Sequence, residues 1–81
     1  MVIGSGCQIL SDTVIKKSII WQNARLGQHV ILRNSLVANN CCLNSNSIVE
    51  DSTLGDSVTV GNGYKLEPGS KIWPGTIVEA P

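Results

Sequence analysis

Few residues of this 81-residue chain could do chemistry, and histidine is among the rarest of them. His29 is the single histidine, and an imidazole at a subunit seam can act as the general base that deprotonates the acceptor of an acyl transfer. A zinc site built from three histidines is out of reach for one chain that carries one. The sequence therefore offers one candidate general base and predicts neither a metal site nor a cofactor.

The cysteines are the other candidate nucleophiles. Cys7, Cys41 and Cys42 are odd in number and have none of the spacings of a disulfide framework. The sequence fixes no histidine or lysine beside the Cys41–Cys42 pair to activate a thiolate, so packing is the favoured role for both. We interpret all three as free thiols in a reducing compartment, which predicts a cytoplasmic location.

Charge and composition exclude several classes of partner. Six basic and six acidic residues give a formal net charge of +0, so electrostatics offers no case for nucleic acid. The aromatic residues are only Trp21, Tyr64 and Trp73, too few for a base-stacking platform. No apolar run approaches 18 residues and the start does not resemble a signal peptide, so we expect no membrane partner.

The elements that position these residues follow from a regular aliphatic repeat. The steps between successive members are 6, 6 and 5 residues three times over, followed by four steps of six. Three steps sum to 17, and self-similarity at a fixed period indicates a stacked repeat architecture. The fourteen members are Ile3, Ile9, Ile15, Ile20, Leu26, Leu32, Val37, Leu43, Val49, Leu54, Val60, Leu66, Ile72 and Val78.

Each six-residue unit of the repeat is too short for a strand and a helix but suits one short strand and one corner. Three such units then make a triangular coil, and stacked coils pair each strand with its equivalents above and below. We therefore expect a single all-β domain over residues 1–81, a single-stranded parallel β-helix of about five coils. The repeats run from about Ile3 to Val78.

A second inward position is expected four residues after each aliphatic. It holds mostly small or β-branched residues, as a narrow core requires. Tyr64 is the misfit, because a phenol there either overpacks the interior or turns outward or plugs the end of the core. The three columns are Cys7, Ala24, Cys41 and Val58; Thr13, Val30, Ser47 and Tyr64; and Ile19, Leu36, Thr53 and Ser70.

The corners are expected three residues after each aliphatic, where types that tolerate a left-handed backbone recur. His29 falls in this column, which gives it a purely structural interpretation beside the catalytic one. The column is Gly6, Asp12, Ser18, Asn23, His29, Ser35, Asn40, Asn46, Ser52, Ser57, Gly63, Gly69 and Gly75. At the five-residue steps, the sequence leaves open whether the serine or the next residue points inward.

The pattern resembles the hexapeptide repeat of left-handed β-helix proteins over about 76 residues. The 6-6-5 alternation, the phrases IKKSIIWQNARLG and ILRNSLV and the ending KLEPGSKIWPGTIVE resemble one subgroup. This subgroup is the C-terminal domain of sugar-nucleotide pyrophosphorylases, particularly those like mannose-1-phosphate guanylyltransferase. The resemblance implies a left-handed triangular prism and a parent enzyme that transfers a nucleotidyl group to a sugar phosphate.

The catalytic domain of that family has no counterpart in these 81 residues. No Gly-rich nucleotide loop is present, so no catalytic residue can be carried over, and Trp73 and Pro74 of the IWPG phrase match a non-catalytic part of the pattern. We expect a non-catalytic structural and oligomerisation module. The alternative is a small trimeric hexapeptide acyltransferase that uses His29.

Two surfaces are candidates for partners, which we expect to be further copies of the chain or a missing N-terminal catalytic domain. One is a column of Trp21, Ala38, Gly55 and Trp73, with Gly4 at its start, because exposed tryptophan is enriched at interface hot spots. The other is the first coil, which has no cap. The opposite end carries Pro68, Pro74 and Pro81, which cannot donate a backbone hydrogen bond to a further strand.

Overall fold

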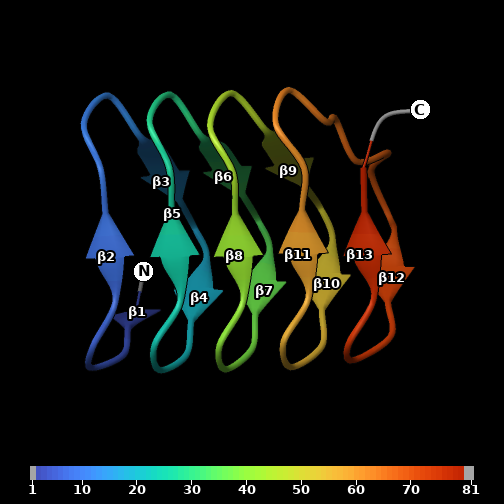
Figure 1. Ribbon diagram of the computed structural model, residues 1–81, viewed down its shortest axis with the longest axis horizontal. Helices are drawn as coiled ribbons and strands as arrows, with labels where there is room; N and C mark the ends of the chain where they lie inside the picture. Colours follow the sequence, from blue (N-terminus) through green and yellow to red (C-terminus); the bar gives the residue numbers. More distant parts are fainter. Residues whose placement is uncertain (1, 80–81) are drawn as a thin grey trace.

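A computed structural model describes residues 2–79, which form thirteen short β-strands and no helix. Pro81 of the predicted capping prolines lies outside the described residues. The strands fall into three parallel sheets that run along the sides of a prism (Figure 1). Principal extents of the described chain are 31 × 24 × 18 Å.

Every third strand belongs to the same sheet. Sheet A contains β1 (Val2–Ile3), β4 (Ile19–Ile20), β7 (Leu36–Val37), β10 (Thr53–Leu54) and β12 (Lys71–Ile72). Sheet B contains β2 (Gln8–Ile9), β5 (Arg25–Leu26), β8 (Cys42–Leu43), β11 (Thr59–Val60) and β13 (Ile77–Val78). Sheet C contains β3 (Val14–Lys16), β6 (Ile31–Arg33) and β9 (Ile48–Glu50).

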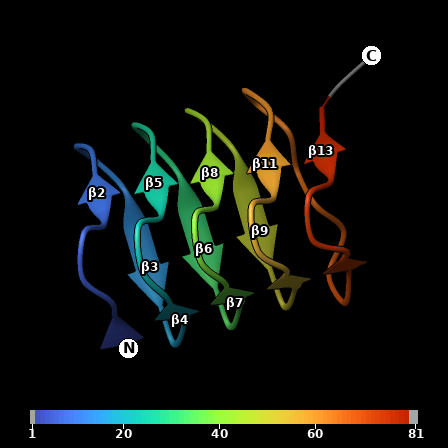
Figure 2. The same ribbon diagram turned by 60° about the horizontal axis from the view of Figure 1, so that its bottom comes forward.

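The coil is left-handed, as the resemblance implies. The near strands of sheet B run upward in Figure 1, the more distant strands β3 and β4 run downward, and the chain advances from left to right. Figure 2 shows the same order of coils from another side. Residues 17 apart are partners in the first coils, as in Val2↔Ile19 and Ile19↔Leu36. The predicted β-helix of about five coils is confirmed.

The core is the column of repeating aliphatic residues, confirmed as inward-facing in the middle coils. Nine of them are at most 3% exposed: Ile20, Leu26, Leu32, Val37, Leu43, Val49, Leu54, Val60 and Leu66. Ala24, Val30, Cys41, Ser47 and Val58 fill the predicted second inward positions and are also buried. Tyr64 is half-buried and packs against this core, so it lies against the interior of the fourth coil rather than turning away.

At the five-residue steps, where the sequence left the inward residue open, the serine points inward and the residue of the third column that follows it does not. Ile19 is 43% exposed, Thr53 is exposed and Leu36 is half-buried, because the side chains at these positions face outward. The inward positions belong instead to Ser18, Ser35 and Ser52, which are 1%, 5% and 2% exposed. A five-residue step has one residue fewer in its corner, so the serine takes the inward place and the next residue starts the strand.

The corner residues explain this shift. The left-handed backbone occurs at ten of the thirteen predicted positions, including Asp12 at φ 62°, His29 at φ 58° and Gly63 at φ 67°. At the three five-residue steps it falls one residue earlier than predicted. Those residues are Lys17, Asn34 and Asp51, with φ of 49°, 48° and 50°. The tight corner therefore turns before the serine and not on it.

The three inward serines form a hydrogen-bonded ladder along one edge of the core. The Oγ of Ser18 donates to the carbonyl of Lys16 at 2.8 Å and accepts the amide N–H of Ser35 at 3.2 Å. The Oγ of Ser35 donates to the carbonyl of Arg33 at 2.6 Å and accepts the amide N–H of Ser52 at 3.2 Å. Buried hydroxyls are thus fully satisfied inside an apolar prism.

The fourth coil ends the ladder and one of the sheets. Leu66 and Ile72 are six residues apart, so the partners in the last coil differ by 18, as in Thr53↔Lys71. Sheet C has no fourth strand among the described residues and continues only as the single bridge Ile48↔Lys65. The extra residue is accommodated at Pro68 and Gly69, with Gly69 at φ 85°.

Candidate interaction surface

The outward side of sheet A is an apolar face. One column along it runs through Val2, Ile19, Leu36, Thr53 and Lys71, and the other through Gly4, Trp21, Ala38, Gly55 and Trp73. Val2 is 59%, Ile19 43%, Trp21 46% and Trp73 81% exposed. Lys71, in the last coil, is the one charged residue of these ten. We call these ten residues the apolar face.

Backbone hydrogen bonds place the residues of the tryptophan column in one row along the prism. The amide of Trp21 donates to the carbonyl of Val37, the amide of Ala38 to that of Leu54 and the amide of Gly55 to that of Ile72. Each column member therefore lies one coil above the last. Ala38 is only 6% exposed, while the two tryptophans project on either side of it along the row.

Two shallow hollows interrupt the apolar face, one beside each tryptophan. The first is lined by Val2, Gly4, Ile19 and Trp21 together with Ile20, Gln22 and Asn39. The second is lined by Thr53, Gly55, Ile72 and Trp73 together with Lys71 and Pro74. Both glycines face close neighbours in the next coil, since an added Cβ would lie 2.8 Å from the carbonyl carbon of Trp21 or from the ring of Pro74.

Sequence reasoning missed the first column of the apolar face because it grouped Ile19 and Leu36 with the expected inward positions and left open whether they or the preceding serines point inward. A usable signal was present. Ile19 directly precedes the inward Ile20, and Leu36 directly precedes the inward Val37. Successive strand side chains point to opposite faces, so both residues had to face out. The true surface is accordingly about twice as wide as the predicted tryptophan column.

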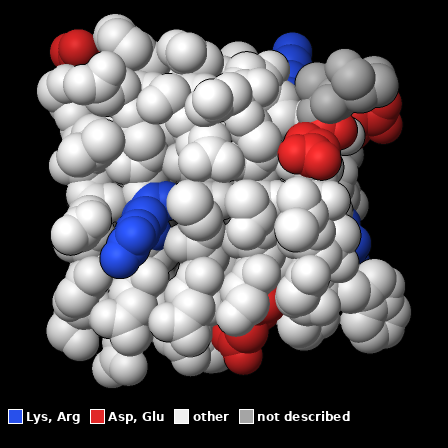
Figure 3. All heavy atoms as spheres, in the orientation of Figure 1, with Lys and Arg blue, Asp and Glu red and all other residues white. Residues whose placement is uncertain are grey.

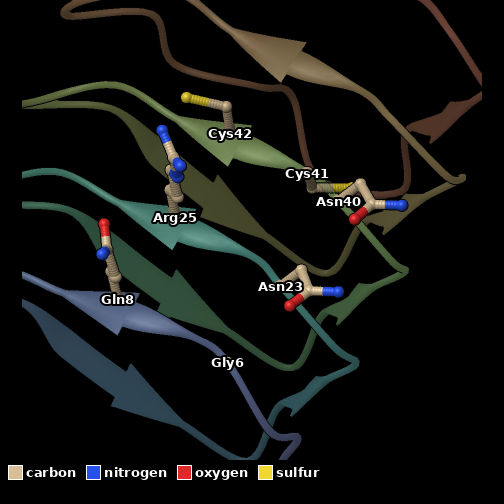
Figure 4. A pocket seen from close by; sticks show the side chains of 7 residues that line it. All are labelled: Gly6, Gln8, Asn23, Arg25, Asn40, Cys41 and Cys42. Atoms are coloured by element: carbon tan, nitrogen blue, oxygen red, sulfur yellow. The ribbon is translucent and has the colours of Figure 1, made fainter.

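Sheet B carries a polar hollow instead. Figure 4 shows Arg25 on β5 between Gln8 and Cys42, with Asn23 and Asn40 at the neighbouring corners. One guanidinium and three side-chain amides supply hydrogen-bond donors, but the lining contains no carboxylate or histidine. Figure 3, which looks onto this side of the molecule, shows few charged atoms on a mostly uncharged surface. The hollow provides no acid–base pair.

His29 occupies an exposed corner. Its Nε2 lies 3.8 Å from Oδ2 of Asp12, the equivalent corner residue of the previous coil, and both side chains are largely exposed. Its backbone has φ 58°, and its amide donates to the carbonyl of Ser11. The residue is therefore accounted for by the left-handed corner that it forms, and the acyltransferase alternative is not favoured.

The three cysteines are free thiols in the described structure. Cys41 is buried, its Sγ donates to the carbonyl of Gly55 at 3.0 Å, and burial raises the pKa of its thiol. A raised pKa suppresses the thiolate, so Cys41 is a packing residue and not a nucleophile. Cys42 is half-buried and outward, between Arg25 and Thr59 in sheet B.

Other site types find no support in residues 2–79. They contain no group of three or more His, Cys, Asp or Glu side chains able to hold a metal ion. They also contain no helix of the length and apolarity needed to cross a bilayer.

The first coil is an open end of the core. Ile3 is 40% and Ile9 37% exposed, whereas their equivalents one coil on, Ile20 and Leu26, are 0% and 1% exposed. These side chains continue the inward columns of Ile20 and Leu26, and within residues 2–79 they are covered from one side only.

Together these features define a left-handed parallel β-helix with an exposed apolar face along sheet A. The family model described as the GMPPB C-terminal domain matches residues 1–80, and the chain belongs to that family. It is a non-catalytic β-helix module of a nucleotidyltransferase family. No curated protein and no solved structure matches the chain significantly.

Proposed function

We propose that the chain is the C-terminal assembly module of a sugar-phosphate guanylyltransferase, and that its open first coil packs against a catalytic domain preceding it. The observation that carries the proposal is the exposure of Ile3 and Ile9 beside fully buried equivalents. Fully burying an exposed aliphatic side chain is worth about 1.5–3 kcal/mol, and since these two are already more than half buried, covering the rest would contribute roughly 1 kcal/mol each.

The polarity of the prism supports this arrangement. Tyr64 and Leu66 close the core of the fourth coil, and Ile72 and Val78 of the last coil are half-buried rather than exposed. The chain end that would join a preceding domain is therefore also the end with uncovered inward side chains. Membership of a C-terminal domain family agrees with a partner on that side.

In this arrangement the preceding domain carries out the nucleotidyl transfer. The module would contribute a fixed surface for docking and for association of subunits, and it would bind neither the nucleotide nor the sugar phosphate. Its three free thiols, one of them buried, support a reducing compartment such as the cytoplasm.

A binding experiment tests the docking. The domain encoded upstream of this chain is produced separately and titrated calorimetrically with the 81-residue chain, with Ile9→Asp and with the control Ile77→Asp at the opposite end of sheet B. Ile77 is 66% exposed and outward, so its replacement leaves the first coil intact. We expect binding by the chain and the control and at least a tenfold weaker affinity for Ile9→Asp, because that change puts a charge into an apolar contact.

Two results contradict the proposal. Equal affinities for all three chains, each with unchanged circular dichroism, would show that the first coil is not the docking surface. An upstream coding region without a nucleotide-binding domain would remove the catalytic partner altogether.

A further inference from the structure

We infer that the apolar face of sheet A pairs with the same face of a second copy of this chain, about a two-fold axis that passes through the row of Leu36 and Ala38. The inference rests on the assembly role proposed above and names its surface and partner. It does not depend on the inward side chains of the first coil, Ile3 and Ile9, which face the end of the prism rather than its side.

The order of residues along the tryptophan column carries the argument. Counting by coil, the column reads glycine, tryptophan, alanine, glycine, tryptophan. Turned end for end about the central alanine, it reads tryptophan, glycine, alanine, tryptophan, glycine. Every tryptophan then lies opposite a glycine and Ala38 lies opposite Ala38. The chain is thus self-complementary in shape, as an isologous two-fold interface requires.

The two hollows coincide with the glycines of this scheme. Trp21 of one copy faces the hollow beside Gly55 of the other, and Trp73 faces the hollow beside Gly4. Trp73 is 81% exposed, so most of its indole is available to enter such a hollow. A bulky aromatic residue that fills a partner's pocket is the usual form of an interface hot spot.

The second column is compatible with the same axis. Leu36 meets Leu36 on the axis, and Ile19 meets Thr53. Lys71 meets Val2 at the edge, where its aliphatic stem can cover the valine while the ammonium stays in water. No charge therefore lies in the centre of the contact. A two-fold axis parallel to the prism and lying over the tryptophan column would instead place tryptophan on tryptophan and glycine on glycine.

The size of the face sets the expected affinity. Four coil spacings of about 4.8 Å make the face roughly 19 Å long. Its two columns are two residues apart along the strands, about 7 Å, so the face covers well under the roughly 800 Å² per partner of a standard stable interface. We therefore expect a reversible dimer that dissociates on dilution.

Light scattering on a sizing column at several concentrations tests the surface. The chain of 8.6 kDa should approach twice that mass at high concentration. Trp73→Ala should raise the dissociation constant about tenfold or more, as truncation of a hot spot does. Ile77→Ala is the matched control, since it removes an outward side chain of the same coil that is 66% exposed but belongs to sheet B. Equal weakening by the two variants would overturn the inference.

The axis has a sharper test. Leu36→Lys and Leu36→Glu should each be monomeric, because each places two like charges on the axis, and an equimolar mixture of the two should recover dimers. Thr53→Lys mixed with Thr53→Glu should recover little, because Thr53 faces Ile19 and not its own copy. Recovery by the Thr53 pair, or none by the Leu36 pair, would exclude this axis.

The outcomes separate the two proposals. Dimers that survive Trp73→Ala would refute the pairing while leaving an assembly role intact. A chain that stays monomeric at all concentrations would refute both self-association and the pairing, whereas docking to the upstream domain is measured by its own titration.

Discussion

Replacing Ser35 with alanine tests the serine ladder where it is most fully connected. The hydroxyl of Ser35 donates to the carbonyl of Arg33 at 2.6 Å and accepts the amide N–H of Ser52 at 3.2 Å. The alanine variant loses both bonds and leaves the amide of Ser52, a residue only 2% exposed, without its acceptor. An unsatisfied buried donor costs about 1–3 kcal/mol, so we expect a loss of about 2 kcal/mol in the free energy of unfolding.

Ser52→Ala is the matched control. The hydroxyl of Ser52 donates to the carbonyl of Glu50 at 2.7 Å, but no amide of residues 2–79 donates to it in turn. Its removal therefore costs one hydrogen bond and strands no buried N–H, which predicts a loss of about 1 kcal/mol. Each variant replaces a hydroxymethyl group with a methyl group at an equivalent inward position, so packing effects should be similar.

Urea unfolding followed by circular dichroism measures the difference, with thermal unfolding as a second readout. For a domain of 60–100 residues, 1 kcal/mol corresponds to about 4–8 °C in Tm, so the two variants should be clearly resolved. The m value should stay constant if both variants retain the native coil. A Ser52→Ala variant that loses as much as Ser35→Ala, or more, would refute the idea that a stranded amide dominates.

Two further predictions concern the core. Leu26→Ala should cost about 2–5 kcal/mol because Leu26 is 1% exposed, while Ile9→Ala at the equivalent position of the open first coil, 37% exposed, should cost clearly less in the same urea assay. Similar losses would contradict the open end. Burial raises the pKa of the Cys41 thiol above its ordinary value in the folded chain. The unfolded state therefore loses this proton first as pH rises. The contribution of this thiol to stability is fully present below the ordinary thiol pKa and declines through the alkaline range above it, and Cys41→Ala should remove that part of the decline in pH-dependent unfolding.

Much of this fold could be predicted because it repeats. Positions such as Leu26, Leu43 and Val60 are equivalent, and each confirms the spacing set by the others. Within each repeat of a stacked coil, only two positions need to be specified, the one whose side chain points inward and the one where the chain turns. Residue type marks both, because aliphatic residues occupy the inward positions and Gly, Asn or Asp occupy most of the corners.

The errors arose where residue type and spacing disagreed. Ser18, Ser35 and Ser52 look like corner residues because serine is common in turns, but a five-residue step has no room for a turn there. Lys17 adopts φ 49° although lysine has no preference for the left-handed region, so tertiary packing decides its conformation. The misplaced corner hid the outward side chains of Ile19 and Leu36, and with them half of the apolar face.

The short corners of the coil fix the distance between partners attached at different points along the molecule. Successive coils are joined through tight turns with no linker between them, and each 17-residue coil in the first part of the chain returns to the same face. A body fixed to the first coil and a body bound at Trp73 are therefore held at a set separation and a set angle about the prism. Inserting one complete 17-residue coil would lengthen the module by about 4.8 Å without rotating either end. Distance between attached partners is thus encoded in the number of coils.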